Sequence, residues 1–263
     1  MGQVRVGAVG YLNARPLTWA LDQAPERWLM RYDVPSECAS LLHDGAVDVG
    51  LVPSIEYLRS AEFRLVPGVG VCSRGPVASV ALYSRGPIAQ VREIALDTSS
   101  RTSVALVRVL CHHHFRITPR FVPHAPDLAV MTREHDAGLL IGDPALDAAH
   151  ESLGLQKTDL GEAWTAMTGL PFVYAAWTGR PGALRPDDVR ALQQAQEEGT
   201  EASAVIAAEY GKGDVARTAR AATYLRDNVH YGLGPDEAAG LQLFLDLASV
   251  LGLVERRRVL EFF

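Results

Sequence analysis

The chain has little of what marks secreted, membrane-spanning or thiol-based metal proteins. Only three cysteines occur in 263 residues. Because Cys38, Cys72 and Cys111 form no Cys-x-x-Cys pair, neither a disulfide framework nor a zinc or redox site is predicted. No run of about 18 apolar residues could span a bilayer, and the first residues lack the basic flank and apolar core of a secretory signal. We therefore expect a cytoplasmic protein without membrane contacts.

Positive charge is also scarce. The net charge is −6, and no basic stripe with interleaved aromatics offsets it, so a nucleic-acid partner is not expected. Arg256-Arg-Arg258 is the one tight basic run, which we interpret as a solvated C-terminal face. Hydrophobic residues make up 48% and charged residues 21% of the chain, which is typical of a soluble globular protein. The length allows one large domain or two of ordinary size.

Histidine is present, but not in an arrangement that predicts a metal site. His112-His-His114 falls on a predicted helix, where consecutive side chains point about 100° apart and cannot converge on one ion. Glu134-His135-Asp136 is equally compatible with a solvated turn. Gly68-Val-Gly70 is not a dinucleotide loop, because the third glycine is misplaced and a predicted strand follows in place of a helix. We therefore expect no metal and no cofactor.

The first eleven residues after Val6 switch from strand to helix chemistry. Val4 to Val9 is mostly apolar and β-branched, as in a strand buried on both faces, and Pro16 is suited to the first turn of a helix. In open α/β folds ligands bind at the carboxyl edge of the sheet, so Tyr11 and Asn13 should face a pocket. The amide of Asn13 could hold a substrate oxygen or cap the helix. The local sequence leaves both roles open.

Two further strand-to-helix units follow. Leu29 to Val34 leads into a helix from Pro35, and Ala46 to Val52 leads into a helix from Pro53. Three such units predict a parallel, doubly wound sheet. Leu65 to Cys72 and Val77 to Tyr83 then form two strands with no room for a helix between them, which predicts an antiparallel insertion.

A second α/β unit begins with the predicted strand from Glu93 to Asp97. Thr98-Ser-Ser-Arg-Thr-Ser103 follows it and opens an apolar helix from Val104 to about Phe115. Hydroxyl groups, an arginine and free N–H groups at a helix N-terminus suit a carboxylate or phosphate. The alternative is a heavily capped helix start. Gly138 to Leu146 repeats the switch and places Asp143 at the same edge.

The remainder predicts one more strand and then helices. Leu170 to Trp177 has the pattern of a buried strand, and no further strand of consequence is expected after Pro186. We predict two lobes with a ligand cleft between them, the last helices packing on the first lobe, and crossings near Tyr83 to Pro87 and Pro171 to Ala175. The expected boundaries are 1–86 and 173–263 for the first lobe and 87–172 for the second. The expected terminal helices are 187–198, 202–210, 215–229 and 237–251.

This α/β layout resembles the type II periplasmic-binding-protein fold. Five motifs in order narrow the resemblance to the chorismate dehydratases of the futalosine route to menaquinone. The resemblance implies a carbon–oxygen lyase that removes water from chorismate to give 3-[(1-carboxyvinyl)oxy]benzoate, without a metal or redox cofactor. The motifs are Val6 to Leu17, Gly50 to Tyr57, Asp97 to Ser103, Leu140 to Leu146, and Asp159 to Phe172.

The resemblance also implies a set of site residues. Asn13 would orient the reacting groups, and no histidine falls within the five motifs, so the base should be a carboxylate. Asp143, Glu56 and a carboxylate of the substrate itself all stay open, since Asp143 could be a helix cap and Glu56 a helix-face residue. The expected substrate-binding residues are Tyr11, Ser54, Ser84, Thr98, Ser99, Ser100, Arg101, Thr102, Gly142 and Thr168.

Three alternatives share this fold. A solute-binding protein for a small carboxylate would bind without turnover, but it needs a secretory signal or lipidation cysteine near its start. A 1,4-dihydroxy-6-naphthoate synthase of the same pathway is expected to use a histidine. The effector domain of a DNA-bound regulator is disfavoured, because no helix-turn-helix precedes the first strand. A homodimer is left open.

Overall fold

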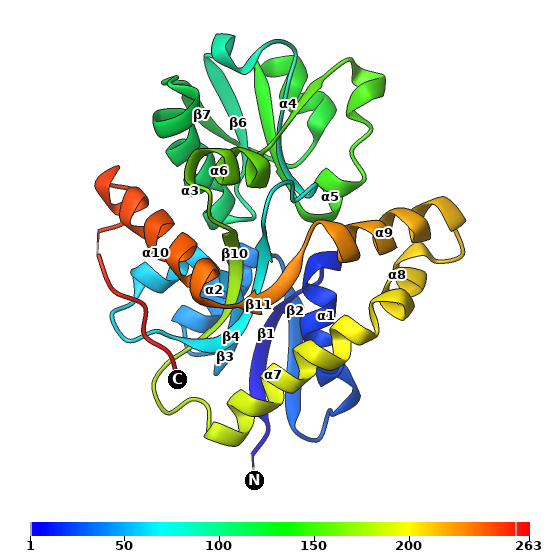
Figure 1. The fold of residues 1–263 in the computed structure, drawn as a ribbon, viewed down its shortest axis with the longest axis vertical. Helices are drawn as coiled ribbons and strands as arrows, with labels where there is room; N and C mark the ends of the chain where they lie inside the picture. Colours follow the sequence, from blue (N-terminus) through cyan, green and yellow to red (C-terminus); the bar gives the residue numbers. More distant parts are fainter. Residues whose placement is uncertain (1, 256) are drawn as a thin grey trace.

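The computed structural model describes residues 2–255 and 257–263, so Arg256 of the predicted basic run lies outside the described residues. Two lobes lie one above the other, each built on a sheet with helices around it (Figure 1). The strands are β1 (Val4–Val9), β2 (Trp28–Asp33), β3 (Val49–Pro53), β4 (Arg64–Ser73), β5 (Val80–Ser84), β6 (Glu93–Asp97), β7 (Arg120–His124), β8 (Ala137–Ile141), β9 (Gln156–Asp159), β10 (Phe172–Gly179) and β11 (His230–Leu233).

Helices connect most of these strands and form the C-terminal part of the chain. The α-helices are α1 (Arg15–Thr18), α2 (Pro35–His43), α3 (Arg101–Leu110), α4 (Leu128–Glu134), α5 (Gly142–Leu146), α6 (Leu160–Thr168), α7 (Pro186–Glu201), α8 (Ser203–Gly211), α9 (Val215–Asp227) and α10 (Pro235–Val250). The short 3-10 helices are η1 (Leu12–Ala14), η2 (Leu21–Gln23), η3 (Ser54–Arg59), η4 (Ile88–Gln90) and η6 (His150–Leu153), and η5 (Cys111–Phe115) is a π-helical turn that extends α3.

One side of each sheet is parallel, as the strand-to-helix units predict. Within the described residues the first sheet has the order β11-β4-β10-β3-β1-β2 and the second the order β7-β6-β8-β5-β9. β1 runs parallel to β2 and β3, and β6 runs parallel to β7 and β8. β3 is buried along its whole length, as expected for a central parallel strand covered on both faces. The loops that follow β1, β3, β6 and β8 therefore meet where the lobes face each other.

The first crossing between the lobes differs from the prediction. β4 pairs antiparallel with β10 and β11 in the first sheet, whereas β5 pairs antiparallel with β8 and β9 in the second. The two strands therefore do not form one insertion, and the crossing at Tyr83 to Pro87 is wrong, because the chain has already crossed between Ser73 and Val80. The return crossing lies between Thr168 and Phe172, overlapping the predicted segment only at Pro171.

The C-terminal helices pack on the first lobe and also reach the second. A Cβ on Gly199 of α7 would lie 1.9 Å from the carbonyl oxygen of Pro16, so this glycine lets α7 lie directly on α1. α9 approaches α5 (Figure 1), and Arg217 and Arg220 of α9 contact Asp147, which follows α5. The expectation of no strand after Pro186 is wrong: β11 adds four residues to the edge of the first sheet beside β4.

Aromatic packing fixes the return crossing. Trp164 of α6 meets Phe172 of β10 with ring centroids 5.2 Å apart, and Phe172 meets Phe244 of α10 at 4.9 Å, both in edge-on arrangements. The three cysteines are buried and unpaired. Among the described residues, no helix is both long and apolar enough to cross a membrane.

Candidate active site

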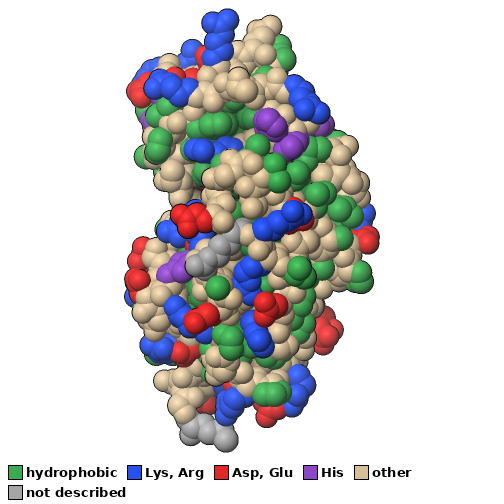
Figure 2. Space-filling model, turned by 90° about the vertical axis from the view of Figure 1, so that its left-hand side faces the viewer, with side chains coloured by type: hydrophobic (Ala, Val, Ile, Leu, Met, Phe, Trp, Pro, Cys, Tyr) green, Lys and Arg blue, Asp and Glu red, His purple; other side chains and the backbone are tan. Residues whose placement is uncertain are grey.

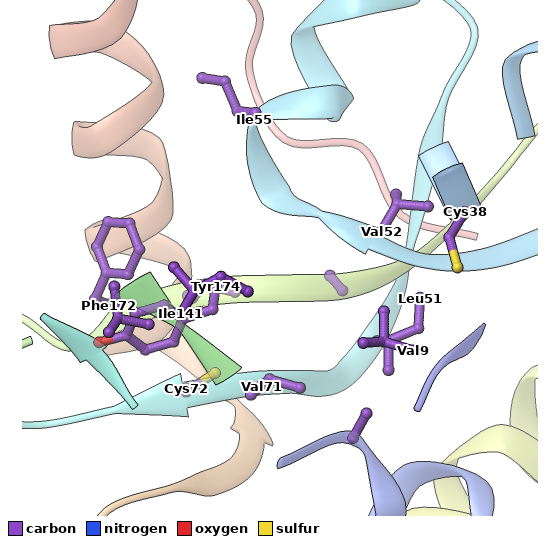
Figure 3. Packing of buried hydrophobic residues seen from close by; sticks show 14 of the residues in the cluster. Val9, Cys38, Leu51, Val52, Ile55, Val71, Cys72, Ile141, Phe172 and Tyr174 are labelled. Carbon is purple, nitrogen blue, oxygen red and sulfur yellow. The ribbon is translucent and has the colours of Figure 1, made fainter. Parts of the chain in front are cut away.

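A cavity of about 460 Å³, its mouth included, lies between the lobes. The apolar side chains around it come from both sheets: Val9, Leu51 and Val71 belong to the first, and Ile141 ends β8 of the second (Figure 3). The full lining is Val9, Tyr11, Asn13, Ala14, Pro35, Leu51, Pro53, Val71, Val80, Ser100, Ser103, Ile141, Gly142, Tyr174 and Ala175.

Tyr11 and Gly142 shape one wall of the cavity. Gly142 has φ of +62°, and a Cβ at this position would lie 2.6 Å from Cδ2 of Tyr11. The glycine therefore meets two requirements, a left-handed backbone and close approach of the tyrosine ring. Its N–H donates to the carbonyl of Ser79 at 2.8 Å. Burial raises the pKa of Tyr11, so its hydroxyl stays protonated at neutral pH.

Asn13 lines the cavity and does not cap a helix. It lies in the middle of η1, and the structure gives neither η1 nor α1 a side-chain cap. Burial raises the pKa of Tyr224 on α9, and a hydrogen bond from the side chain of Asn13 to the Tyr224 hydroxyl lowers that pKa in part. The Tyr224 hydroxyl also lies 2.7 Å from the hydroxyl of Ser79, at the first crossing. An element from the far end of the chain thus supports the Asn13 side of the cavity.

The N-terminus of α3 supplies the second polar wall. Ser100 is the N-cap: its hydroxyl accepts the N–H of Ser103 at 3.4 Å and lies 3.1 Å from the Ser103 hydroxyl. Both serines line the cavity. α3 has ten residues, so its aligned peptide dipoles give this end a partial positive charge. Ser100 both caps α3 and lines the cavity. The capping and the anion-binding interpretations of this segment are therefore compatible.

Arg101 and Glu56 lie outside the cavity and bind each other. Glu56 is fully buried on η3, and Arg101 contacts its carboxylate at 3.1 Å across the lobe interface. His43 and Arg59 also contact this carboxylate, at 2.8 and 3.1 Å. Arg101 also donates to the hydroxyl of Ser40 at 3.2 Å. These contacts anchor the start of α3 to the first lobe, so the structure separates both residues from the space where a substrate would sit.

Asp143 also faces away from the cavity and joins the lobes. Its carboxylate accepts the N–H of Leu12 at 2.9 Å, which ties the loop after β8 to the loop after β1. Burial raises its pKa, while the Leu12 N–H acts in the opposite direction. Asp143 lines a separate groove with Arg15, Tyr210 and Arg217, whereas its neighbour Gly142 lines the cavity.

The other predicted residues have contacts of their own. The Thr102 hydroxyl accepts the N–H of Ile55 at 3.1 Å, and the Ser54 hydroxyl donates to the Val173 carbonyl at 2.7 Å. Thr168 donates to the Trp164 carbonyl within α6. Of the predicted set, Tyr11, Asn13, Ser100 and Gly142 line the cavity. Ser84, Thr98 and Ser99 do not: Ser84 bonds the Gly86 carbonyl at the end of β5, and Thr98 and Ser99 line an outer groove.

Sequence reasoning missed two tyrosines near the site. Tyr174 lies within the predicted strand from Leu170 to Trp177, but the sequence did not show which face of that strand meets the cavity. Tyr224 belongs to the C-terminal helices, whose packing depends on long-range contacts. The alternation of side chains along β10 was the available indication for Tyr174; we find no local indication for Tyr224.

Charges of both signs are interspersed on the face shown in Figure 2, as the composition suggests. The cavity differs from this surface. Among its lining residues that the structure describes, none carries a carboxylate, an imidazole or a cationic group. The polar side chains of the lining are those of Asn13, Ser100, Ser103, Tyr11 and Tyr174, and the start of α3 adds backbone N–H groups.

Comparisons with known proteins agree with this architecture. The model of a family described as menaquinone biosynthesis matches residues 4–250. A chorismate dehydratase of Thermus thermophilus is 32% identical over 215 residues, which cover 74% of this chain and 76% of the relative.

Solved structures at lower sequence identity show similarity in the fold alone. A protein of Archaeoglobus fulgidus superposes with a TM-score of 0.75 at 18% identity, covering 96% of this chain and 98% of that one. The periplasmic aliphatic sulphonate binding protein of Escherichia coli gives 0.67 at 17% identity, covering 97% and 89%. The expected periplasmic-binding-protein-like fold is confirmed, and the chain belongs to the menaquinone biosynthesis family.

Proposed function

We propose that the chain is a chorismate dehydratase, a carbon–oxygen lyase that converts chorismate into 3-[(1-carboxyvinyl)oxy]benzoate and water. The proposal draws on the similarity to the Thermus thermophilus enzyme over most of the chain. The structural observation that carries it is the chemistry of the cavity, which combines apolar walls with uncharged donors and a helix N-terminus. Such a lining suits a flat, cyclic dianion.

The start of α3 would hold one carboxylate of the substrate. The positive end of the helix dipole and the free N–H groups of the first turn favour an anion there. Ser100 and Ser103 add hydroxyl donors on the same side. Arg101 would act through position, because its contact with Glu56 keeps this helix end against the first lobe.

The reaction needs only small assistance from the protein. A proton leaves the ring carbon that bears the enolpyruvyl ether, and the C–O bond to the hydroxyl on the neighbouring carbon breaks. The proton and the departing hydroxide together make water, the ring becomes aromatic, and the dianionic charge is unchanged. Since aromatisation drives the reaction, the enzyme mainly has to orient the substrate and help the proton and hydroxide to leave.

Asn13 is the residue we assign to the reacting end. Its amide NH2 can donate a hydrogen bond to the hydroxyl that leaves, and its amide oxygen can accept one from the substrate. The described residues of the lining include no carboxylate and no imidazole that could act as a general base. We therefore propose that a carboxylate of the substrate takes the proton. Asp143 and Glu56, the other two carboxylates considered, are engaged with Leu12 and with the cationic cluster.

The test is to incubate purified protein with chorismate, follow the loss of diene absorption, and identify the product by mass spectrometry. The proposal expects a product lighter by one water that keeps the enolpyruvyl group. Ser100→Ala should raise KM more than it lowers kcat, because a carboxylate that does not react is held equally in the ground and transition states. Ser152→Ala, an exposed serine on η6, is the matched control and should leave both unchanged.

Other outcomes would support the alternatives. Stable binding of chorismate without turnover would indicate a solute-binding protein. Turnover of cyclic dehypoxanthinyl futalosine in place of chorismate would indicate a 1,4-dihydroxy-6-naphthoate synthase. The cavity lining weighs against that second enzyme, because the rival is expected to use a histidine and the described lining contains none.

A further inference from the structure

A cluster of histidine and glutamate lies on the second lobe, apart from the cavity. His124 ends β7, Glu134 ends α4, and His135 follows as the C-cap of α4. One ligand atom from each of these three residues lies within 4.8 Å of the other two. Nε2 of His124 is 3.8 Å from Oε2 of Glu134. The fold therefore brings His124 beside two adjacent residues, Glu134 and His135, that follow it ten and eleven positions later in the sequence.

The hydrogen bonds of the two rings leave one nitrogen of each for a metal. Nδ1 of His124 lies 2.7 Å from the Ala125 carbonyl, which can only accept, so Nδ1 carries the proton. Nδ1 of His135 makes a close hydrogen bond with the Glu93 carboxylate. In each neutral ring the remaining lone pair is on Nε2. A carbonyl or carboxylate behind an imidazole is the usual support of a metal-ligating histidine.

The neighbouring charges leave Glu134 able to contribute an oxygen. Arg133 contacts Oε1 of Glu134 at 2.8 Å, while Oε2 is the oxygen that faces His124. Arg120 pairs with Glu93, so the carboxylate behind His135 is also balanced. The Glu134 side chain is about half exposed and can move, whereas the two rings are mostly buried, at 17% and 12% side-chain exposure.

We propose that His124, Glu134 and His135 bind a divalent zinc ion, with solvent completing its coordination. Two imidazole nitrogens and one carboxylate oxygen are ligands that zinc accepts. With bonds of 2.0–2.1 Å, ligand atoms around tetrahedral zinc lie about 3.3 Å apart. The Nε2 to Oε2 distance of 3.8 Å therefore needs only a small movement of the exposed carboxylate. The ion would join edge strand β7 to the end of α4 and stabilise the second lobe.

Titration of tag-free full-length protein with zinc chloride by calorimetry tests the site. We expect one zinc per chain and a rise in Tm with zinc concentration, because zinc would bind the folded protein preferentially. His124→Asn and Glu134→Gln should each weaken binding at least about tenfold.

The consecutive histidines on η5 provide the matched control. The double variant His112→Asn/His114→Asn removes two exposed imidazoles from another part of the same lobe and should bind zinc as the wild type does. Loss of binding in this control, with normal binding in His124→Asn and Glu134→Gln, would place the ion at the histidine run and overturn the proposal. Absence of binding by the wild type at about 0.1 mM zinc would overturn it as well.

Discussion

Gly142→Ala tests whether the position of Tyr11 sets the shape of the cavity. An alanine Cβ would lie 2.6 Å from Cδ2 and 2.7 Å from Cε2 of the ring. Ordinary contact between carbon atoms begins near 3.5 Å, so the ring or the loop must move by about 1 Å. A displacement of this size at a reacting centre can cost about 100-fold in rate. The left-handed φ of +62° adds about 1–2 kcal/mol of backbone strain.

Gly154→Ala separates these two effects. Gly154 also lies in the second lobe with a φ of +65°, but a Cβ there would meet nothing within 4 Å. Both variants carry the backbone strain and should lose stability in urea denaturation, Gly142→Ala more because of its overlap with the ring, while only Gly142→Ala should lose about 100-fold in kcat/KM for chorismate. Equal kinetic constants for the two variants, with wild-type spectra, would refute the role of the Tyr11 contact.

Three further predictions follow from individual side chains. Asn13→Asp should lower kcat by about 100- to 1000-fold without changing the circular dichroism spectrum, because it removes a positioned donor and sets a charge beside a dianion; near-normal kcat would remove Asn13 from the reaction. Glu56→Gln should cost about 1.5–3 kcal/mol in urea denaturation, because the buried side chain loses its charge-assisted contacts with the partly exposed Arg59 and Arg101; a loss below about 1 kcal/mol would show that the pairs contribute little. Arg185 and Arg27 lower the pKa of Asp188 to about 2, so its stabilising effect is complete above pH 4 and disappears as the pH falls towards 2. Wild type and Asp188→Asn should therefore differ in Tm at pH 7 and converge near pH 2, and a constant difference would contradict this assignment.

Local sequence was sufficient for much of the fold. The parallel strands β1, β3, β6 and β8 are buried runs followed directly by helix starts, so their order along the chain predicted the parallel side of each sheet. The pairing of β4 and β5 could not be predicted in this way. They are neighbours in sequence, but their partners are β10 and β8, and strand pairing over such separations leaves no local pattern.

The candidate site shows the same division. Asn13 and Ser100 follow buried strands at the correct edge, and both reach the cavity. Arg101 and Glu56 also lie in the expected loops, but each has an oppositely charged partner that turns it away from the cavity. A sequence identifies which residues follow a strand, whereas their partners depend on the packing of the lobes. His124 joins His135 and Glu134 for the same reason.

Proton NMR of chorismate during incubation with the purified protein tests the central claim most directly. We predict that the ring diene signals are replaced by the aromatic signals of a 3-substituted benzoate, while the two vinyl protons of the enolpyruvyl group remain. An unchanged spectrum, or an aromatic product accompanied by free pyruvate, would contradict the assignment of this cavity to the dehydration of chorismate.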